Sequence, residues 1–133
     1  MTKKKTKNIS QKLSLRKQKP LSPKLTQKLQ FAYSLHQKGD INQAKDAYQQ
    51  ILTARPSHAE TNFLLGLLIS HAGHYQQSEA LLSRAVQANP SEPRYLVGFG
   101  ILLLKIDKFK EAANVLQKAV KFVPNEIEAI CNL

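Results

Sequence analysis

Three stretches of the sequence, which start 34 residues apart, decide the fold: FAYSLHQKGDINQAKDAYQQILTARP (31–56), LGLLISHAGHYQQSEALLSRAVQANP (65–90) and FGILLLKIDKFKEAANVLQKAVKFVP (99–124). They agree in residue size as well as in polarity, and each ends in a proline. A fixed period of this length indicates a repeat protein. The chain is 42% hydrophobic with few aromatic residues and no Trp, which is typical of packed helices rather than of a β-barrel.

Each stretch predicts two helices. Apolar residues recur at spacings of three and four, as in Phe63, Leu64, Leu67 and Leu68, which is the pattern of one helix face. The expected helices span 23–37, 41–54, 58–72, 75–88, 92–106 and 109–122, and a seventh begins near 126.

Residues that end and begin helices lie at these boundaries. Gly39, Gly73 and Asp107 separate the paired helices, and each can adopt the left-handed conformation that ends a helix. Ser22, followed by Pro23, predicts the start of the first helix. Further N-caps are predicted at Ser91 and, as capping boxes, at Ser57 with Glu60 and at Asn125 with Glu128.

Small residues recur in the first helix of each unit, at Ala32, Gly66 and Gly100, and face small residues in the second, at Ala44, Ser78 and Ala112. Together with Pro56, Pro90 and Pro124, this pattern resembles the tetratricopeptide repeat over about residues 25–133. The resemblance implies an all-α fold, a right-handed superhelical solenoid of antiparallel helix pairs with three full repeats and the start of a fourth. The family's Trp position holds Lys28, Asn62 and Leu96 instead.

Basic residues are concentrated at the N-terminus. Residues 1–38 hold 11 of the 20 Lys and Arg residues and no acidic residue, whereas the other nine basic residues balance all nine acidic ones. We therefore expect a basic, disordered tail over residues 1–21 and the repeat domain over 22–133. Nucleic acid or an anionic membrane is expected to bind, if at all, through this tail. The repeats are expected at about 25–58, 59–92 and 93–126, with a partial repeat at 127–133.

The last unit is half a repeat. It offers Ile127, Ile130 and Leu133 as apolar residues with no following helix to cover them. In a solenoid each repeat buries its apolar face on a neighbour. We therefore expect the chain to be the N-terminal piece of a longer protein, and the isolated piece to self-associate through this uncapped repeat.

The sequence contains no glycine-rich phosphate loop, no nucleophile elbow and no acidic pair in an apolar setting, so neither an enzyme nor a cofactor is expected within it. His71 and His74 lack further ligands at local spacing, and no metal site is predicted. Cys131, the single cysteine, excludes an internal disulfide and is expected to act as a small apolar residue. Without a signal sequence or an apolar run of roughly 20 residues, we expect a soluble, cytoplasmic protein.

The concave surface of such a superhelix is lined by the first helix of each repeat, and we expect a protein or peptide partner to bind there. Its centre is apolar, and Arg94 and Lys105 are expected to contact acidic residues of the partner. The alternative is that the apolar members only pack between the helices. The residues predicted to line this groove are Tyr33, His36, Gln37, Phe63, Leu67, Ser70, His71, Arg94, Val97, Ile101, Leu104 and Lys105.

Two uses of the family bear on function. Members that grip the C-terminal carboxylate of chaperones use Lys, Asn and Arg side chains at five positions. The matching positions here hold Leu29, Tyr33, Leu64, Arg94 and Gly98, so only one of the five is retained and no carboxylate clamp is expected. Multi-domain enzymes that resemble O-linked N-acetylglucosamine transferases, and some sulfotransferases, begin with similar repeats. A substrate-recruiting region of such a glycosyltransferase or sulfotransferase is therefore the alternative to a protein-interaction scaffold.

Overall fold

The computed structural model describes residues 19–122, and within this range the chain forms six α-helices and no strand. Each helix begins and ends within one residue of the predicted bounds, so the all-α prediction is confirmed. The seventh helix, the partial repeat at 127–133, Cys131 and residues 1–18 of the tail lie outside the described residues. The helices are α2 (Pro23–Lys38), α3 (Ile41–Ala54), α4 (Ala59–His71), α5 (Tyr75–Ala88), α6 (Pro93–Lys105) and α7 (Phe109–Phe122).

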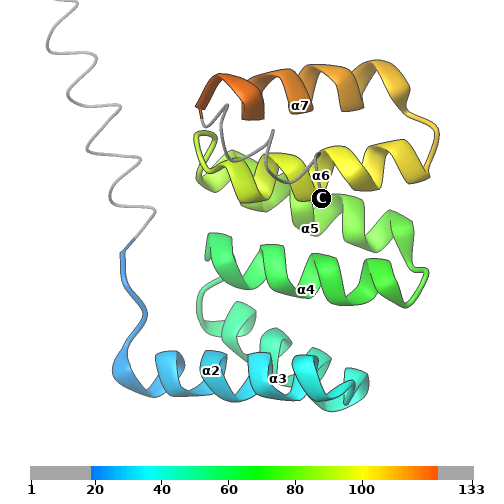
Figure 1. Cartoon of the computed structure of the whole chain (residues 1–133). Helices are drawn as coiled ribbons and strands as arrows, with labels where there is room; N and C mark the ends of the chain where they lie inside the picture. The colour runs from blue at the N-terminus through cyan, green and yellow to red at the C-terminus, as the bar shows by residue number, and fades with distance from the viewer. Residues whose placement is uncertain (1–18, 123–133) are drawn as a thin grey trace, which may run out of the picture.

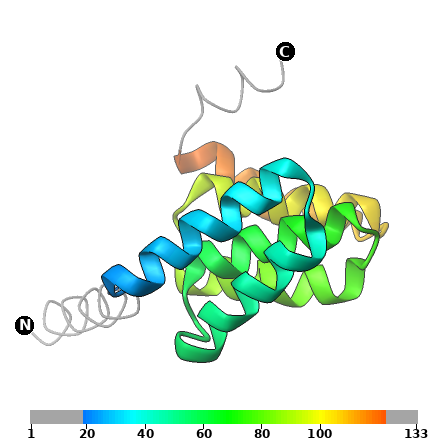
Figure 2. The same ribbon diagram turned by 90° about the horizontal axis from the view of Figure 1, so that it is seen from below.

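The helices form three antiparallel pairs, α2 with α3, α4 with α5 and α6 with α7, and the pairs stack in chain order (Figure 1). Each helix also packs against the next along the chain, so that α3 touches α4 and α5 touches α6. The view from below places α2 and α3 nearest the viewer, with the later pairs behind them (Figure 2). This is the stacked arrangement of a helical repeat solenoid.

Small buried residues bring the two helices of each pair close together. Ser78 in α5 donates a hydrogen bond from its hydroxyl to the carbonyl oxygen of Gly66 in α4, at 2.7 Å. Both residues are buried, and so are the corresponding small residues of the other two pairs. The predicted close approach of the paired helices is therefore confirmed.

The turns between paired helices use the residues that the sequence indicated. Gly39 and Gly73 have φ of 85° and 91°, in the left-handed region where a side chain is disfavoured. Asp107 adopts the same conformation at φ 64° in the third turn. At the start of α2, the Ser22 hydroxyl accepts a hydrogen bond from the N–H of Leu25, as predicted.

The N-cap predicted at Ser57 is wrong. Helix α4 is capped by His58, whose Nδ1 accepts from the N–H of Thr61 at 3.3 Å and lies 2.8 Å from the Thr61 hydroxyl. The Glu60 carboxylate does not turn back to the helix start, because it bonds to side chains of the next repeat.

The N-cap predicted at Ser91 is also wrong. Helix α6 begins at Pro93, and the residue before it, Glu92, is the cap: its Oε1 accepts from the N–H of Arg94 at 3.3 Å. The Ser91 hydroxyl instead lies 3.4 Å from Asn89 Oδ1. In both helices the capping role therefore falls one residue later than the sequence pattern suggested.

Asn62 occupies the position where the family has Trp, and it is fully buried. Its side-chain amide donates to the carbonyl oxygens of Pro56 and His58, at 3.0 and 2.9 Å. The amide therefore ties the loop between α3 and α4 to the first turn of α4.

Acid is expected to destabilise the fold, partly through His58. Burial, with the positive charge of Arg55, lowers the pKa of His58 below its ordinary value of 6.5. Between that lowered pKa and 6.5 the unfolded chain binds more protons than the folded chain, so the free energy of unfolding falls as the pH drops below about 6.5. His58→Asn keeps a capping acceptor but does not titrate. Urea denaturation should therefore show that, between pH 7 and pH 5.5, the free energy of unfolding falls less for His58→Asn than for the wild type.

His74→Asn is the matched control for this experiment. His74 also stands at an N-cap position, that of α5, but its side chain makes no capping hydrogen bond. We expect this variant to keep the wild-type pH dependence. Equal reductions of the pH dependence in the two variants would show that the capping imidazole of His58 is not the cause.

Candidate functional site

The first helices of the three repeats lie along one side of the solenoid. Helix α4 contacts α2 and α6 in addition to its neighbours in the chain. On each of these helices a row of residues spaced three and four apart turns to the same side. The rows are Leu29, Tyr33 and His36 on α2, Glu60, Leu64, Leu67 and His71 on α4, and Arg94, Val97, Ile101 and Leu104 on α6.

Most of the predicted groove residues are accessible. Tyr33, Ile101 and Leu104 are 44%, 47% and 44% exposed, which is high for apolar side chains. Gln37, His71, Arg94 and Lys105 are also exposed, and His36, Leu67 and Val97 are half-buried. We call the surface formed by these ten residues the groove.

Phe63 and Ser70 do not belong to the groove, because they are only 6% and 7% exposed. The Phe63 ring packs against the Tyr95 ring of α6, with centroids 4.8 Å apart. It fits there because Gly98 has no side chain: a Cβ at this position would lie 2.8 Å from Phe63 Cε1. Phe63 therefore packs between the helices, which was the alternative to a place in the groove.

Glu60 and Arg94 form a network between the second and third repeats. The two guanidinium NH2 groups of Arg94 donate to the two carboxylate oxygens of Glu60, at 3.2 and 3.0 Å, and Tyr95 donates its hydroxyl to Glu60 Oε2 at 2.6 Å. Arg94 Nε also donates to Glu92 Oε1 at 3.4 Å. The guanidinium further lies over the rings of Phe63 and Tyr95, 5.8 and 5.6 Å from their centroids.

The network changes the electrostatics of the groove. The hydrogen bonds to Glu60 raise the pKa of Arg94, and burial, followed by the hydrogen bond to Glu60, raises the pKa of Tyr95. Arg94 was expected to reach out to acidic residues of a partner. In the structure its guanidinium is bonded to two carboxylates of its own chain, while the side chain remains 58% exposed, so contact with a partner stays a prediction.

The role of Glu60 was missed because its distance from Ser57 suggested a capping box. A signal did exist: Glu60 and Arg94 are 34 residues apart and therefore occupy the same position in successive repeats.

The other end of α2 carries a neutral aromatic cluster. The imidazole Nδ1 of His36 lies 3.1 Å from the hydroxyl of buried Tyr48, and the ring of Tyr33 meets His36 edge-on with centroids 6.2 Å apart. Burial, followed by the nearby charge of His71, lowers the pKa of His36. At neutral pH His36 is therefore uncharged.

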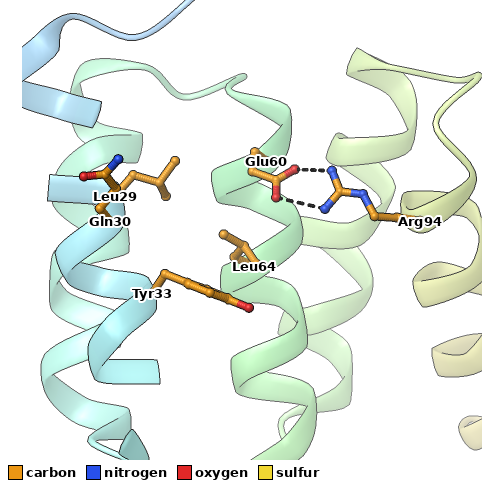
Figure 3. A pocket seen from close by; sticks show the side chains of 6 residues that line it. All are labelled: Leu29, Gln30, Tyr33, Glu60, Leu64 and Arg94. Atoms are coloured by element: carbon orange, nitrogen blue, oxygen red, sulfur yellow. Dashed lines mark hydrogen bonds and ion pairs between the residues drawn. The ribbon is translucent and has the colours of Figure 1, made fainter. Parts of the chain in front are cut away.

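A pocket of about 320 Å³ opens between α2, α4 and α6 (Figure 3). Four of its residues stand at positions compared above with the carboxylate clamp. Glu60 and Arg94 face each other across one wall, and Tyr33 lies beside Leu64 (Figure 3). The lining residues are Leu29, Gln30, Tyr33, Glu60, Leu64 and Arg94.

Residues 19–122 contain no group of three or more His, Cys, Asp or Glu side chains placed to hold a metal ion. None of the helices described in this range is long and apolar enough to cross a membrane.

Comparison with known proteins gives a consistent result. A family model described as tetratricopeptide repeat matches residues 35–96 and 71–130. The cellulose synthase operon protein C of Pseudomonas fluorescens is 29% identical over 80 residues, which are 60% of this chain and 6% of that protein. Its match therefore involves only a small part of the relative.

The chain is similar to many solved structures, among them the following three. An O-GlcNAc transferase mutant of Thermobaculum terrenum matches at 28% identity and a TM-score of 0.71, over 75% of this chain and 19% of its own. The first TPR of Spaghetti bound to an HSP90 peptide matches at 19% identity and a TM-score of 0.77, over 85% of this chain and 90% of its own. The Yersinia enterocolitica chaperone SycD in complex with a YopD peptide matches at 21% identity and a TM-score of 0.76, over 84% of this chain and 87% of its own.

Proposed function

Since the chain belongs to the tetratricopeptide repeat family, we propose that it is a non-catalytic scaffold that binds a segment of a partner protein in the groove of α2, α4 and α6. The observation that carries the proposal is the row of exposed apolar side chains on this side, Tyr33, Ile101 and Leu104. Solvent-exposed apolar side chains flanked by polar ones are typical of surfaces that bind a peptide or a helix.

The similar structures support this proposal. The Spaghetti domain and SycD each hold a peptide of another protein and share the stacked helix pairs of this chain. Their low sequence identity supports the shared fold but leaves the bound sequence open. The ligand of this chain must therefore be found by an unbiased selection from a displayed peptide library.

Ile101→Glu is expected to weaken binding of the selected peptides at least about tenfold. A carboxylate in the middle of the apolar row on α6 must be desolvated when the peptide covers it. Isothermal titration calorimetry with wild type and variant measures the change in Kd.

The matched control is Phe109→Glu, which places the same charge on α7 at a side chain that is 61% exposed. We expect it to bind the peptides like the wild type. If Ile101→Glu retains full affinity, or if both variants lose it equally, the groove is not the binding surface.

A second candidate function is a substrate-recruiting region of a larger enzyme. The observation in its favour is the 28% identity to the O-GlcNAc transferase over 75% of this chain. The gene separates the two candidates, because a glycosyltransferase or sulfotransferase domain encoded after codon 133 supports recruitment, and a reading frame without a catalytic domain supports the scaffold.

A further inference from the structure

We propose that the pocket between α2, α4 and α6 accepts a basic side chain, Lys or Arg, of the bound peptide. The inference rests on the proposed function and names the chemistry that the pocket recognises. Its volume of about 320 Å³ gives room for one long side chain, near the lower end of the roughly 300–1,000 Å³ typical of ligand pockets. The walls have two parts, an apolar one and a charged one.

The apolar wall consists of Leu29, Leu64 and Tyr33 (Figure 3). Lys and Arg side chains bury their aliphatic stems on such surfaces and keep the charged head near polar groups. Gln30 adds an amide that can donate or accept a hydrogen bond at the edge of the pocket.

The charged wall is the ion pair of Glu60 and Arg94, in which the carboxylate keeps an open acceptor position. One guanidinium, that of Arg94, is bonded to two carboxylates, those of Glu60 and Glu92. The Glu60 side chain is 28% exposed, and its Oε1 accepts one hydrogen bond from Arg94. Since each carboxylate oxygen can accept about two, Oε1 remains open to a cationic donor from a ligand.

Other side chains fit this pocket less well. A carboxylate would meet a guanidinium that is already bonded to two carboxylates, and it would approach the negative charge of Glu60, which like-charge repulsion opposes. An aliphatic side chain would cover the exposed edge of Glu60 without giving it a hydrogen bond, which is costly for a charged group.

The direct test is an NMR titration of the isotopically labelled chain with three blocked amino acids, the acetyl amides of lysine, norleucine and glutamate. We expect the lysine probe to shift the signals of Gln30, Glu60 and Leu64, the norleucine probe to do so more weakly, and the glutamate probe to leave them unchanged. Binding of norleucine or glutamate as tight as that of lysine would overturn the proposal.

Glu60→Gln sharpens the test. The amide keeps an acceptor for the Tyr95 hydroxyl but removes the charge, so the lysine probe should bind about three- to tenfold more weakly. Arg94 loses its bidentate partner, and the glutamate probe should begin to bind. The control is Glu92→Gln, which removes the other carboxylate beside Arg94 outside the pocket lining and should keep the preference for lysine. Thermal melting of both variants checks that they remain folded.

The peptide selection separates this inference from the proposed function. Peptides that bind through Ile101 but contain no common basic residue, and whose affinity is unchanged by Glu60→Gln, would contradict only the inference. Failure to select any peptide would count against the proposed function, and the three blocked amino acids would still decide what the pocket accepts.

Discussion

Replacing Leu82 with Ala is expected to lower the free energy of unfolding by about 2–5 kcal/mol. Leu82 is 0% exposed, and it is one of the buried side chains that join α4, α5 and α6. In a solenoid each repeat is stabilised by its contacts with its neighbours, and Leu82 lies in the middle repeat. The loss of its methyl groups therefore weakens the packing within the second pair and against the third.

The measurement is urea denaturation followed by far-UV circular dichroism. Leu81→Ala is the control, because it makes the same substitution at the adjacent residue of α5, which is only half-buried. The free energy of unfolding should fall clearly less in Leu81→Ala than in Leu82→Ala. Equal losses at the two positions would contradict the view that Leu82 is central to the core.

Gly66→Ala is expected to destabilise the fold by about 1–3 kcal/mol through overpacking. In the interior of a helix Ala is normally favoured over Gly by about 0.5–1 kcal/mol, so the expected sign is the opposite of the helix preference. A Cβ at Gly66 would lie 2.8 Å from both Cγ and Cδ2 of Leu82. The hydrogen bond from Ser78 to the Gly66 carbonyl opposes a separation of the two helices that would relieve the clash.

A double-mutant cycle tests this explanation. In the Leu82→Ala background the clashing atoms are gone, and the new methyl group of Gly66→Ala fills part of the space they leave. Gly66→Ala should therefore be neutral or stabilising there, which gives a large coupling between the two sites. If Gly66→Ala lowers the free energy of unfolding equally in the wild type and in Leu82→Ala, Gly66 is required for a reason other than its contact with Leu82.

The fold could be predicted closely from the sequence because the same constraints recur every 34 residues. Gly39, Gly73 and Asp107 all mark a left-handed turn, and three copies of one pattern fix the helix bounds better than one copy can. The small pairs, such as Gly66 with Ser78, depend on packing within a single repeat, which the spacing along the chain reveals.

The site was predicted less well, because it depends on contacts between repeats. The spacing on α4 shows which side of the helix Phe63 occupies, but its burial depends on Gly98 in the next repeat. Glu60 has the spacing of a capping residue, yet its carboxylate is held by Arg94 and Tyr95 from α6.

The pairing of Glu60 with Arg94 has a consequence for how such an array grows by gene duplication. Thr26, Glu60 and Arg94 occupy one position in three successive repeats, so the order neutral, acidic, basic distinguishes units that are otherwise alike. A tandem copy of the second repeat would place Glu against Glu at this position, and a copy of the third would place Arg against Arg. The repeats share one backbone arrangement, but the charge at this position determines which repeats can be neighbours without like charges meeting.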